Sequence, residues 1–418
     1  MSDQECEVLV VGAGLAGLRC AGVLDAAGRD VRVWEAADDV GGRIRTDVVD
    51  GFRCDRGFQV LNPAYPALPG SVDVAALRLQ PFLPGVGVRR ERGSITLVHP
   101  LRKPAGVPAM LTAGALRPAD VLALGRWTAP ALRPSRLRSA LGDTRLADAL
   151  DSSGVQGEVR RVLERFLSGV LLDASGATSN AFALLLVRMF VLGVPALPAD
   201  GMAALPRLLA AAVPGRVRTG TRVTSVERGG RDWTVRAHDG ATMRARQVVI
   251  ATDPGTAAGF TGEPAPAMRG VITDWWASDV TPATGGALQV DGRAGARGPV
   301  VNTAVISDAA PSYAPPGRQL IQASALHRAD DTPPSEEQMR AHAAEILGVS
   351  AADWQPVVRH VVSAALPAQP APLVLRRSIR VHSGLWVCGD HRDTASIQGA
   401  LVSGRRTGAA VLRALSCT

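Results

Sequence analysis

Lysine is almost absent from this chain of 418 residues. Lys103 is the only one, so the net charge of +8 comes almost entirely from arginine. A basic chain suits an anionic partner such as nucleic acid or a membrane surface. However, the arginines are spread along the chain and aromatic residues make up only 4% of it, so no stretch interleaves the two as a nucleic-acid groove does. We therefore expect no nucleic-acid partner.

Cysteine and long apolar runs are also scarce. The five cysteines show no C-x-x-C spacing, which argues against a disulfide framework and against a zinc site, and we expect no metal. The longest apolar run, residues 181–194, is short for a membrane span and contains Arg188. The acidic N-terminus is unlike a signal peptide. We expect a cytoplasmic protein without a transmembrane segment, and peripheral contact with a membrane stays open.

The sequence does have a glycine-rich turn near its N-terminus. The apolar run Val8–Val11 predicts a buried strand, and it leads directly into Gly12, Gly14 and Gly17 and then into a helical pattern. These glycines suit a tight turn, a close approach to a pyrophosphate and close helix–strand packing. Glu35 ends the next β-rich run, where a carboxylate can accept hydrogen bonds from a ribose diol. The stretch predicts a βαβ unit that binds NAD or FAD, and Glu35 disfavours NADP.

A second glycine pair follows, Gly41 and Gly42, and it is joined to Arg43. It suits another close backbone approach, with the arginine as a charge partner near the phosphates. Here the run Val8–Thr46 resembles the FAD fingerprint of the superfamily of flavin amine oxidases, protoporphyrinogen oxidases and phytoene desaturases. The resemblance implies FAD, and it implies as cofactor-binding residues Gly12, Ala13, Gly14, Leu15, Ala16, Gly17, Glu35, Ala36, Gly41, Gly42 and Arg43.

Two segments further along resemble the superfamily less specifically. A segment that crosses the isoalloxazine face in the superfamily corresponds here to Gly57, Phe58, Gln59 and Val60. A β-hairpin with a proline-terminated loop explains the same residues equally well. The resemblance also implies a backbone contact of Val223 with the adenine, and it places Ala251 and Thr252 at a strand's carboxyl end beside the dinucleotide.

The second specific signature lies near the C-terminus. A predicted strand delivers Gly389 and Asp390, and a helix pattern starts at Gln398, Gly399 and Ala400. A carboxylate there can bind ribityl hydroxyls, and free N–H groups of Gly399 and Ala400 can stabilise negative charge at the flavin N1–O2 edge. In the superfamily this pattern is the second FAD signature. No cysteine lies between Asp390 and Gly404, so we expect the FAD to be noncovalent.

The predicted fold is α/β, with a doubly wound, Rossmann-like FAD-binding domain and an inserted α+β substrate domain. We expect the FAD-binding domain to be discontinuous, from residues 1–65, 203–255 and 377–418, and the substrate domain to comprise 66–202 and 256–376. A helical pattern over residues 105–192 belongs to the substrate domain.

The function that this resemblance implies is two-electron oxidation of a small, fairly apolar molecule by hydride transfer to flavin N5, with a quinone or O₂ as acceptor. Three alternatives stay open: an amine oxidase that uses O₂, a redox-neutral isomerase on reduced FAD, and a flavin-binding scaffold without turnover. The catalytic residues are unknown. His99, Glu164 and Asp173 have acid–base side chains, but nothing in the sequence places them near a flavin.

The near absence of lysine bears on the amine oxidase alternative. Amine oxidases of this superfamily typically hold a lysine near flavin N5, from the later half of the substrate domain, and flank the flavin with an aromatic cage. Here Lys103 lies in the earlier half, the only tyrosines are Tyr65 and Tyr313, and residues 394–398 contain no aromatic residue. From the sequence we expect little that could build a cage, slow reoxidation by air, and a carbon–carbon bond donor rather than a simple amine.

Overall fold

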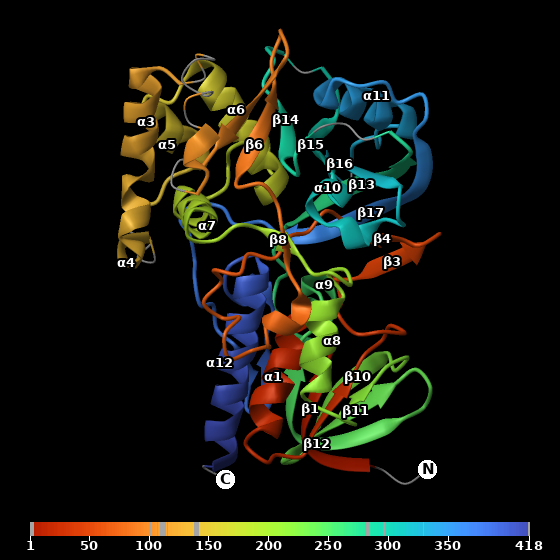
Figure 1. The fold of residues 1–418 in the computed structure, drawn as a ribbon. Helices are drawn as coiled ribbons and strands as arrows, with labels where there is room; N and C mark the ends of the chain where they lie inside the picture. The colour runs from red at the N-terminus through yellow and green to blue at the C-terminus, as the bar shows by residue number, and fades with distance from the viewer. Residues whose placement is uncertain are drawn as a thin grey trace.

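The computed structural model describes residues 4–99, 102–106, 108, 114, 116–137, 142–280, 284–295, 297–328 and 330–416. The lower part of the molecule in Figure 1 is an eight-stranded sheet, the upper right is a seven-stranded sheet, and a block of helices fills the upper left. Both termini lie at the bottom of this view. The predicted class, α/β with a Rossmann-like part and a second part, is confirmed.

The eight-stranded sheet has the strand order β10-β11-β12-β1-β2-β9, and β19 pairs with both β12 and β18. Its members are β1 (Gln4–Val11), β2 (Val31–Trp34), β9 (Val217–Arg218), β10 (Val223–Gly229), β11 (Asp232–Ala237), β12 (Thr242–Ile250), β18 (Arg380–His382) and β19 (Leu385–Val387). The strands β1, β2, β9, β12 and β19 run parallel, whereas β10 and β11 form an antiparallel hairpin. This sheet therefore draws on three separate stretches of the chain, and the domain boundaries given above stay a prediction.

Both faces of the central strand β1 are buried, which explains its unbroken apolar run. Val8 and Val10 pack in one hydrophobic cluster with the helices α1 (Leu15–Asp25) and α12 (Ile397–Ser416). Leu9 and Val11 pack in a second cluster with the hairpin β10–β11. Because side chains alternate along a strand, four apolar residues in a row satisfy both faces at once.

The seven-stranded sheet has the order β17-β13-β16-β15-β14-β6-β7. Its members are β6 (Gly85–Arg89), β7 (Ser94–Val98), β13 (Met268–Ser278), β14 (Leu288–Asp291), β15 (Val300–Val305), β16 (Gln319–His327) and β17 (Gln355–Pro367). Helix α11 (Glu336–Leu347) lies beside it and begins at a capping box of Ser335 and Gln338. The hairpin β6–β7 comes from far earlier in the chain than the other strands and reaches the sheet through a parallel pairing with β14.

The helical block contains α3 (Pro118–Thr128), α4 (Pro134–Leu137), α5 (Leu146–Ser152), α6 (Gly157–Leu171) and α7 (Asn180–Leu192). The helical pattern predicted over residues 105–192 is present in these elements, although residues 107, 109–113, 115 and 138–141 lie outside the described part. No helix among the described residues is long and apolar enough to cross a membrane.

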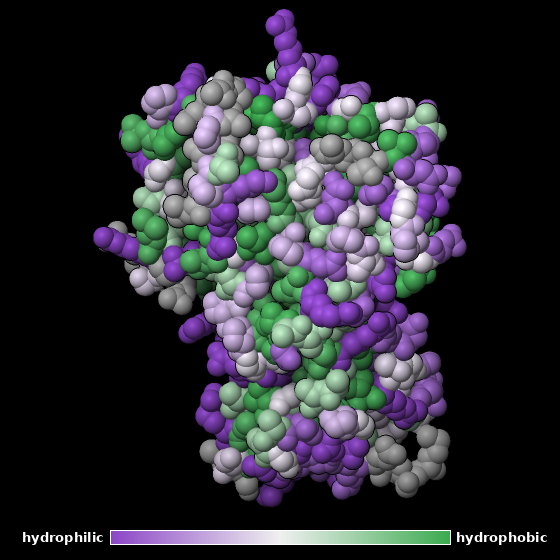
Figure 2. All heavy atoms as spheres, viewed as in Figure 1, coloured by the Kyte–Doolittle hydropathy of each residue, from purple (hydrophilic) through white to green (hydrophobic). Residues whose placement is uncertain are grey.

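Short elements join these three parts. They are β3 (Thr46–Val49), β4 (Phe52–Asp55), β5 (Gln80–Pro81), β8 (Ala196–Leu197), α8 (Ala204–Ala211), α9 (Pro254–Thr261) and α10 (Ile306–Ala309). On the face shown in Figure 2, hydrophobic side chains gather at the waist of the molecule, where these elements lie, and on the helical block. The outer rim is largely hydrophilic.

The turn between β1 and α1 depends on close backbone contacts. Gly12 has a φ of +107°, and a Cβ on it would lie 2.8 Å from the carbonyl oxygen of Ala251. A Cβ on Gly17 would overlap the carbonyl oxygen of Gly12 and would lie 3.0 Å from the Cβ of Ala251. These contacts press α1 against the ends of β1 and β12 and leave no room for any side chain.

This packing yields a matched pair of substitutions on one helix. We expect Gly17→Ala to destabilise the protein by about 1–3 kcal/mol or more, because the new methyl group meets rigid backbone. Gly22→Ala is the control: no atom lies within 4 Å of its added Cβ, so it should stabilise the helix by about 0.5–1 kcal/mol. Thermal and urea unfolding of both variants measures the difference. Equal stability of the two variants would contradict the proposed contact.

Candidate active site

One cavity of about 830 Å³ connects the eight-stranded sheet with the upper part of the molecule. It begins at the carboxyl ends of β1, β2 and β12, where Val11, Trp34 and Ala251 line it. This edge is where parallel α/β sheets bind their ligands. The volume lies in the range of clefts that hold drug-sized molecules and cofactors, about 300–1,000 Å³.

The first wall of the cavity is the turn before α1. Gly14, Leu15 and Ala16 line it, and no side chain caps the first turn of α1. N–H groups at a helix start and the positive end of the helix dipole form an anion site. No atom lies within 4 Å of a Cβ built on Gly14, so the space above this turn is open to a ligand.

Glu35 lies directly beside this turn and is only 9% exposed. One carboxylate oxygen accepts the N–H of Ala13 at 2.6 Å, and the other accepts the N–H of Ala37 at 2.9 Å. Each carboxylate oxygen can accept more than one hydrogen bond, so the side chain can also receive ribose hydroxyls from the cavity. Glu35 thus holds the shape of the glycine turn in addition to facing the cavity, a role that the sequence did not reveal.

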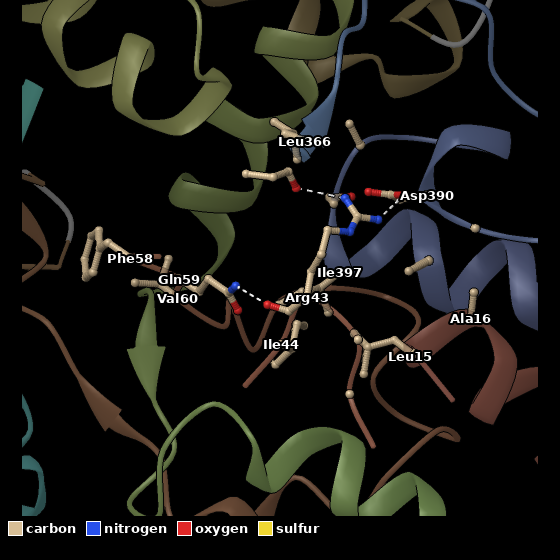
Figure 3. A pocket seen from close by; sticks show the side chains of 18 of the residues that line it. Leu15, Ala16, Arg43, Ile44, Phe58, Gln59, Val60, Leu366, Asp390 and Ile397 are labelled. Carbon is tan, nitrogen blue, oxygen red and sulfur yellow. Dashed lines mark hydrogen bonds and ion pairs between the residues drawn. The ribbon is translucent and has the colours of Figure 1, made fainter. Parts of the chain in front are cut away.

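An ion pair lies at the centre of the cavity. The Arg43 guanidinium is 2.6 Å from the carboxylate of Asp390, and it donates a second hydrogen bond of 2.8 Å to the carbonyl of Ala365 at the end of β17 (Figure 3). Burial alone would lower the pKa of Arg43, but Asp390 and Asp253 together raise it. The guanidinium therefore stays charged and ties the two glycine signatures to the upper sheet.

The segment that follows β4 reaches the same place. Phe58, Gln59 and Val60 line the cavity, and the amide nitrogen of Gln59 donates to the carbonyl of Arg43 at 2.9 Å. The Oε1 of Gln59 is buried and has no hydrogen-bond partner among the described residues. Figure 3 shows the ring of Phe58 on the side of the cavity away from Asp390.

Most residues predicted to bind the cofactor do line this cavity. They are Gly12, Gly14, Leu15, Ala16, Glu35, Ala36, Gly41, Gly42, Arg43, Phe58, Gln59, Val60, Val223, Ala251, Thr252, Gly389, Asp390 and Ala400. Their backbone and side chains come from both ends and the middle of the chain.

Five predicted residues are not part of the lining, and four of them support it. The N–H of Ala13 holds Glu35, and Gly17 allows α1 to approach. The side-chain oxygen of Gln398 accepts the N–H of Ala67 at 2.9 Å, so this side chain ties α12 to the loop after β4. The fourth is Gly399, which is packed so closely on the carbonyl of Thr394 that a Cβ would overlap it. The fifth residue is Gly57, which adopts a φ of +78° and does not line the cavity.

The predicted role of the Gly399 and Ala400 N–H groups is wrong in one respect. The N–H of Gly399 donates to the hydroxyl of Ser396 at 3.1 Å, and the N–H of Ala400 donates to the carbonyl of Ser396 at 3.0 Å. They are not free, because α12 begins at Ile397 and these residues already belong to its capped first turn. Ile397, the first residue of α12, lines the cavity, so its N–H is the one that the start of the helix could offer to a ligand.

The part of the cavity above Arg43 is apolar, and it is called the upper compartment here. Its residues include Leu83, Val86, Val170, Leu186, Val194 and Leu288. Two edge-to-face aromatic pairs also line it: Phe58 with Phe82 at 6.0 Å and Phe166 with Phe190 at 5.4 Å between ring centroids. These rings give the upper compartment aromatic walls. No pattern in the sequence indicates these walls, because the four rings come from four separate segments of the chain. The expectation that little here could build an aromatic cage around the flavin stays a prediction.

The three acid–base candidates separate in the structure. His99 lines the cavity. Glu164 is paired with Arg160 one turn earlier on α6 and faces solvent. Asp173 accepts hydrogen bonds from Ser175 and Thr178 and pairs with Arg269; although burial opposes it, these contacts lower the pKa of Asp173. Glu164 and Asp173 are thus structural residues, and only His99 stays a candidate.

A buried carboxylate, Asp55, lies outside the cavity lining in a hydrogen-bond network. Asp55, at the end of β4, accepts hydrogen bonds from the hydroxyls of Thr46 and Tyr313 and from the N–H of Met202. Burial raises the pKa of Asp55 to about 6. Because Tyr313 is committed to this network, the cavity receives only one tyrosine, Tyr65, whose pKa burial raises to about 12.

Comparison with known proteins places the chain in a family. Residues 15–412 match the family model of flavin containing amine oxidoreductases. The chain belongs to this family. A flavin cofactor and an oxidoreductase function follow from this membership, and the resemblance noted in the sequence is confirmed.

Individual relatives of the family are distant. Putrescine oxidase from Kocuria rosea is 48% identical over 73 residues, which are 18% of this chain and only 15% of that protein. A solved structure of putrescine oxidase bound to putrescine shares 19% identity, with a TM-score of 0.69 over 99% of this chain and 100% of that one. Cyclohexylamine oxidase from Brevibacterium oxydans IH-35A shares 18%, with a TM-score of 0.68 over 98% and 99%. An oxidoreductase from Methanosarcina mazei shares 17%, with a TM-score of 0.73 over 96% and 99%. At these identities the solved structures show a common fold.

The geometry at Glu35 yields a prediction about the cofactor. Glu35→Ala should weaken FAD binding roughly 10-fold or more, because each lost hydrogen bond to a charged group costs about 1.5–3 kcal/mol. The matched control is Asp38→Ala, which removes a neighbouring carboxylate that is 85% exposed and paired only with Arg45. Equilibrium dialysis of the apoproteins against FAD measures both affinities, and unfolding of the apo forms monitors the turn. Equal FAD affinity in the Glu35 variant and the parent would show that Glu35 is not the ribose ligand.

Proposed function

We propose that this protein is an FAD-dependent oxidoreductase that removes two electrons from a small, fairly apolar molecule by hydride transfer to the flavin. The observation that carries this proposal is the single cavity, which joins a dinucleotide-type turn to an apolar compartment. A cofactor and a substrate could therefore meet within it, away from bulk water.

The residues of the lower part fit FAD. The turn at Gly14–Ala16 and the Arg43 guanidinium would hold the pyrophosphate, Glu35 the adenosine ribose, and Val223 the adenine. Asp390 would accept hydrogen bonds from the ribityl hydroxyls. The segment Phe58–Val60 and the start of α12 would border the isoalloxazine ring. The open space above Gly14 and the unpartnered Oε1 of Gln59 support this fit. We place FAD in the part built from residues 1–65, 203–255 and 377–418.

The bound flavin would supply the two-electron acceptor. The protein's own residues would bind and orient the substrate and exclude water. The two phenylalanine pairs give the upper compartment flat apolar walls, and the charged side chains in the described lining all lie on the lower side, at Glu35, Arg43, Arg222, Asp253 and Asp390. His99 is the one titratable imidazole that borders this space.

The first prediction from this proposal concerns attachment of the cofactor. The protein should bind FAD noncovalently, since no cysteine lies between Asp390 and Gly404 and none is in the described lining. Acid precipitation should release all the yellow colour into the supernatant, where mass measurement identifies FAD. Colour that stays in the pellet would contradict noncovalent binding. A colourless protein that cannot be reconstituted with FAD would overturn the proposed function.

A second candidate function is amine oxidation with O₂. The family membership favours it, and so do the two structural relatives named as putrescine and cyclohexylamine oxidases. Two features of this chain favour a different substrate. The upper compartment has no carboxylate among its described residues to pair with a second ammonium group, and Lys103, the only lysine, is exposed outside the cavity.

This difference predicts slow reaction with oxygen. A lysine ammonium near flavin N5 would assist electron transfer to O₂ electrostatically, and no lysine is present in the cavity. We expect the photoreduced protein to reoxidise slowly in stopped-flow mixing with air-saturated buffer and rapidly with a soluble quinone. Fast reoxidation by air, with hydrogen peroxide release during turnover of putrescine or cyclohexylamine, would instead establish the amine oxidase function.

An anaerobic substrate screen separates the remaining alternatives. Bleaching of the flavin on addition of a substrate indicates oxidation. Product formation without bleaching on reduced enzyme indicates redox-neutral isomerisation. A flavoprotein that responds to no compound of the screen would favour a binding scaffold.

A further inference from the structure

The upper compartment contains few polar side chains, and one of them is already satisfied. Asn62 lines the cavity, but its carbonyl oxygen accepts the N–H of Ala64 at 2.9 Å and its amide nitrogen donates to the carbonyl of Met189 at 2.8 Å. Its hydrogen bonds are used within the protein. Asn62 therefore shapes the wall and offers little to a ligand.

Asn302, on β15, is different. It lines the cavity although only 4% of its surface is exposed, and its amide nitrogen donates to no group among the described residues. This nitrogen is not among the fully enclosed polar atoms, so it opens onto the cavity. It can therefore donate a hydrogen bond to a molecule that binds there.

A row of buried polar side chains leads to the oxygen end of this amide. The hydroxyls of Thr273 and Ser324 lie 3.3 Å apart, and the amide nitrogen of Gln322 donates to Ser324 at 2.6 Å and to the carbonyl oxygen of Asn302 at 3.5 Å. The row runs across β13, β16 and β15 to the cavity. Because the Asn302 oxygen faces Gln322, its NH₂ group is the end that remains for a ligand.

Helix α6 leaves room for that NH₂ group. Gly169 of α6 also lines the cavity, and a Cβ on it would overlap the amide nitrogen of Asn302. The rest of α6 that borders this space is apolar, with Phe166 and Val170 on either side of the glycine. The donor is thus set into an otherwise apolar wall, at a position where the helix has a glycine.

We infer that Asn302 is a specificity-determining residue whose amide donates a hydrogen bond to a neutral oxygen of the substrate, so the substrate is an apolar carbon skeleton that carries a carbonyl, ether or hydroxyl oxygen. The absence of Asp, Glu, Lys and Arg from the described lining of the upper compartment disfavours both cations and anions there. This inference rests on the proposed function for its use of the upper compartment as the substrate site.

The test compares two probes of the same shape on FAD-loaded protein. The ketone 2-acetylnaphthalene has an oxygen acceptor, and 2-isopropenylnaphthalene has a CH₂ group in its place. Equilibrium dialysis, with perturbation of the flavin spectrum as a second readout, gives the two dissociation constants. We expect the parent protein to bind the ketone about 3- to 10-fold more tightly, as one neutral hydrogen bond provides.

Two variants then assign the preference to Asn302. Asn302→Leu should remove the preference for the ketone and keep the affinity for the alkene, and Gly169→Ala should reduce the preference by displacing the amide. The control is Thr303→Val on the same strand, whose hydroxyl donates to the carbonyl of Gln322 and which does not line the cavity; it should retain the preference.

The outcomes distinguish this inference from the proposed function. Equal affinity for both probes in the parent protein, failure of the ketone to bind, or an unchanged preference in both Asn302→Leu and Gly169→Ala would overturn the inference. The flavin absorbance of the same samples reports FAD occupancy separately. Loss of FAD would count against the proposed function, whereas full occupancy without a ketone preference would count against the inference alone.

Discussion

The ion pair between Arg43 and Asp390 is the interaction on which the candidate site depends. Arg43 belongs to the N-terminal glycine signature, Asp390 to the C-terminal one, and the carbonyl of Ala365 that Arg43 also binds ends a strand of the upper sheet. The Asp390 side chain of this pair is buried and the Arg43 side chain is 32% exposed, so loss of the arginine would leave an unpaired buried carboxylate. The pair therefore links three segments that are distant in the sequence and that all line the cavity.

The protein itself holds several groups of the lower cavity in place. The carboxylate of Glu35 is held by the N–H groups of Ala13 and Ala37, and the start of α12 is capped by Ser396. Groups that are already fixed lose little freedom when a ligand binds, which favours affinity. The lower part of the cavity is thus largely preorganised.

The upper compartment differs from the lower part in the polarity of its lining. Its walls are contributed by the helices α6 and α7, the segment 82–84 before β6 and the strand β15. They offer mainly apolar and aromatic contacts. In such an environment we expect an oriented amide to favour ligands that accept its hydrogen bond. The lower part of the cavity thus contains the charged side chains of the described lining, and the upper compartment is mainly apolar.

The sequence by itself determined the parts whose signals are local. The run Val8–Val11, the glycines after it and Glu35 lie within one βαβ unit. Gly389 and Asp390 directly follow one strand. In both cases residues that are close in the sequence are also close in space. The tertiary structure alone decided which residues of the middle region meet. Phe82, Phe166, Phe190 and Asn302 come from separate elements whose contacts depend on how the helical block closes over the seven-stranded sheet. It also decided that Glu164 faces solvent and that the Gly399 and Ala400 N–H groups are capped, because burial and hydrogen-bond partners are set by packing between segments and leave no periodic trace in the sequence.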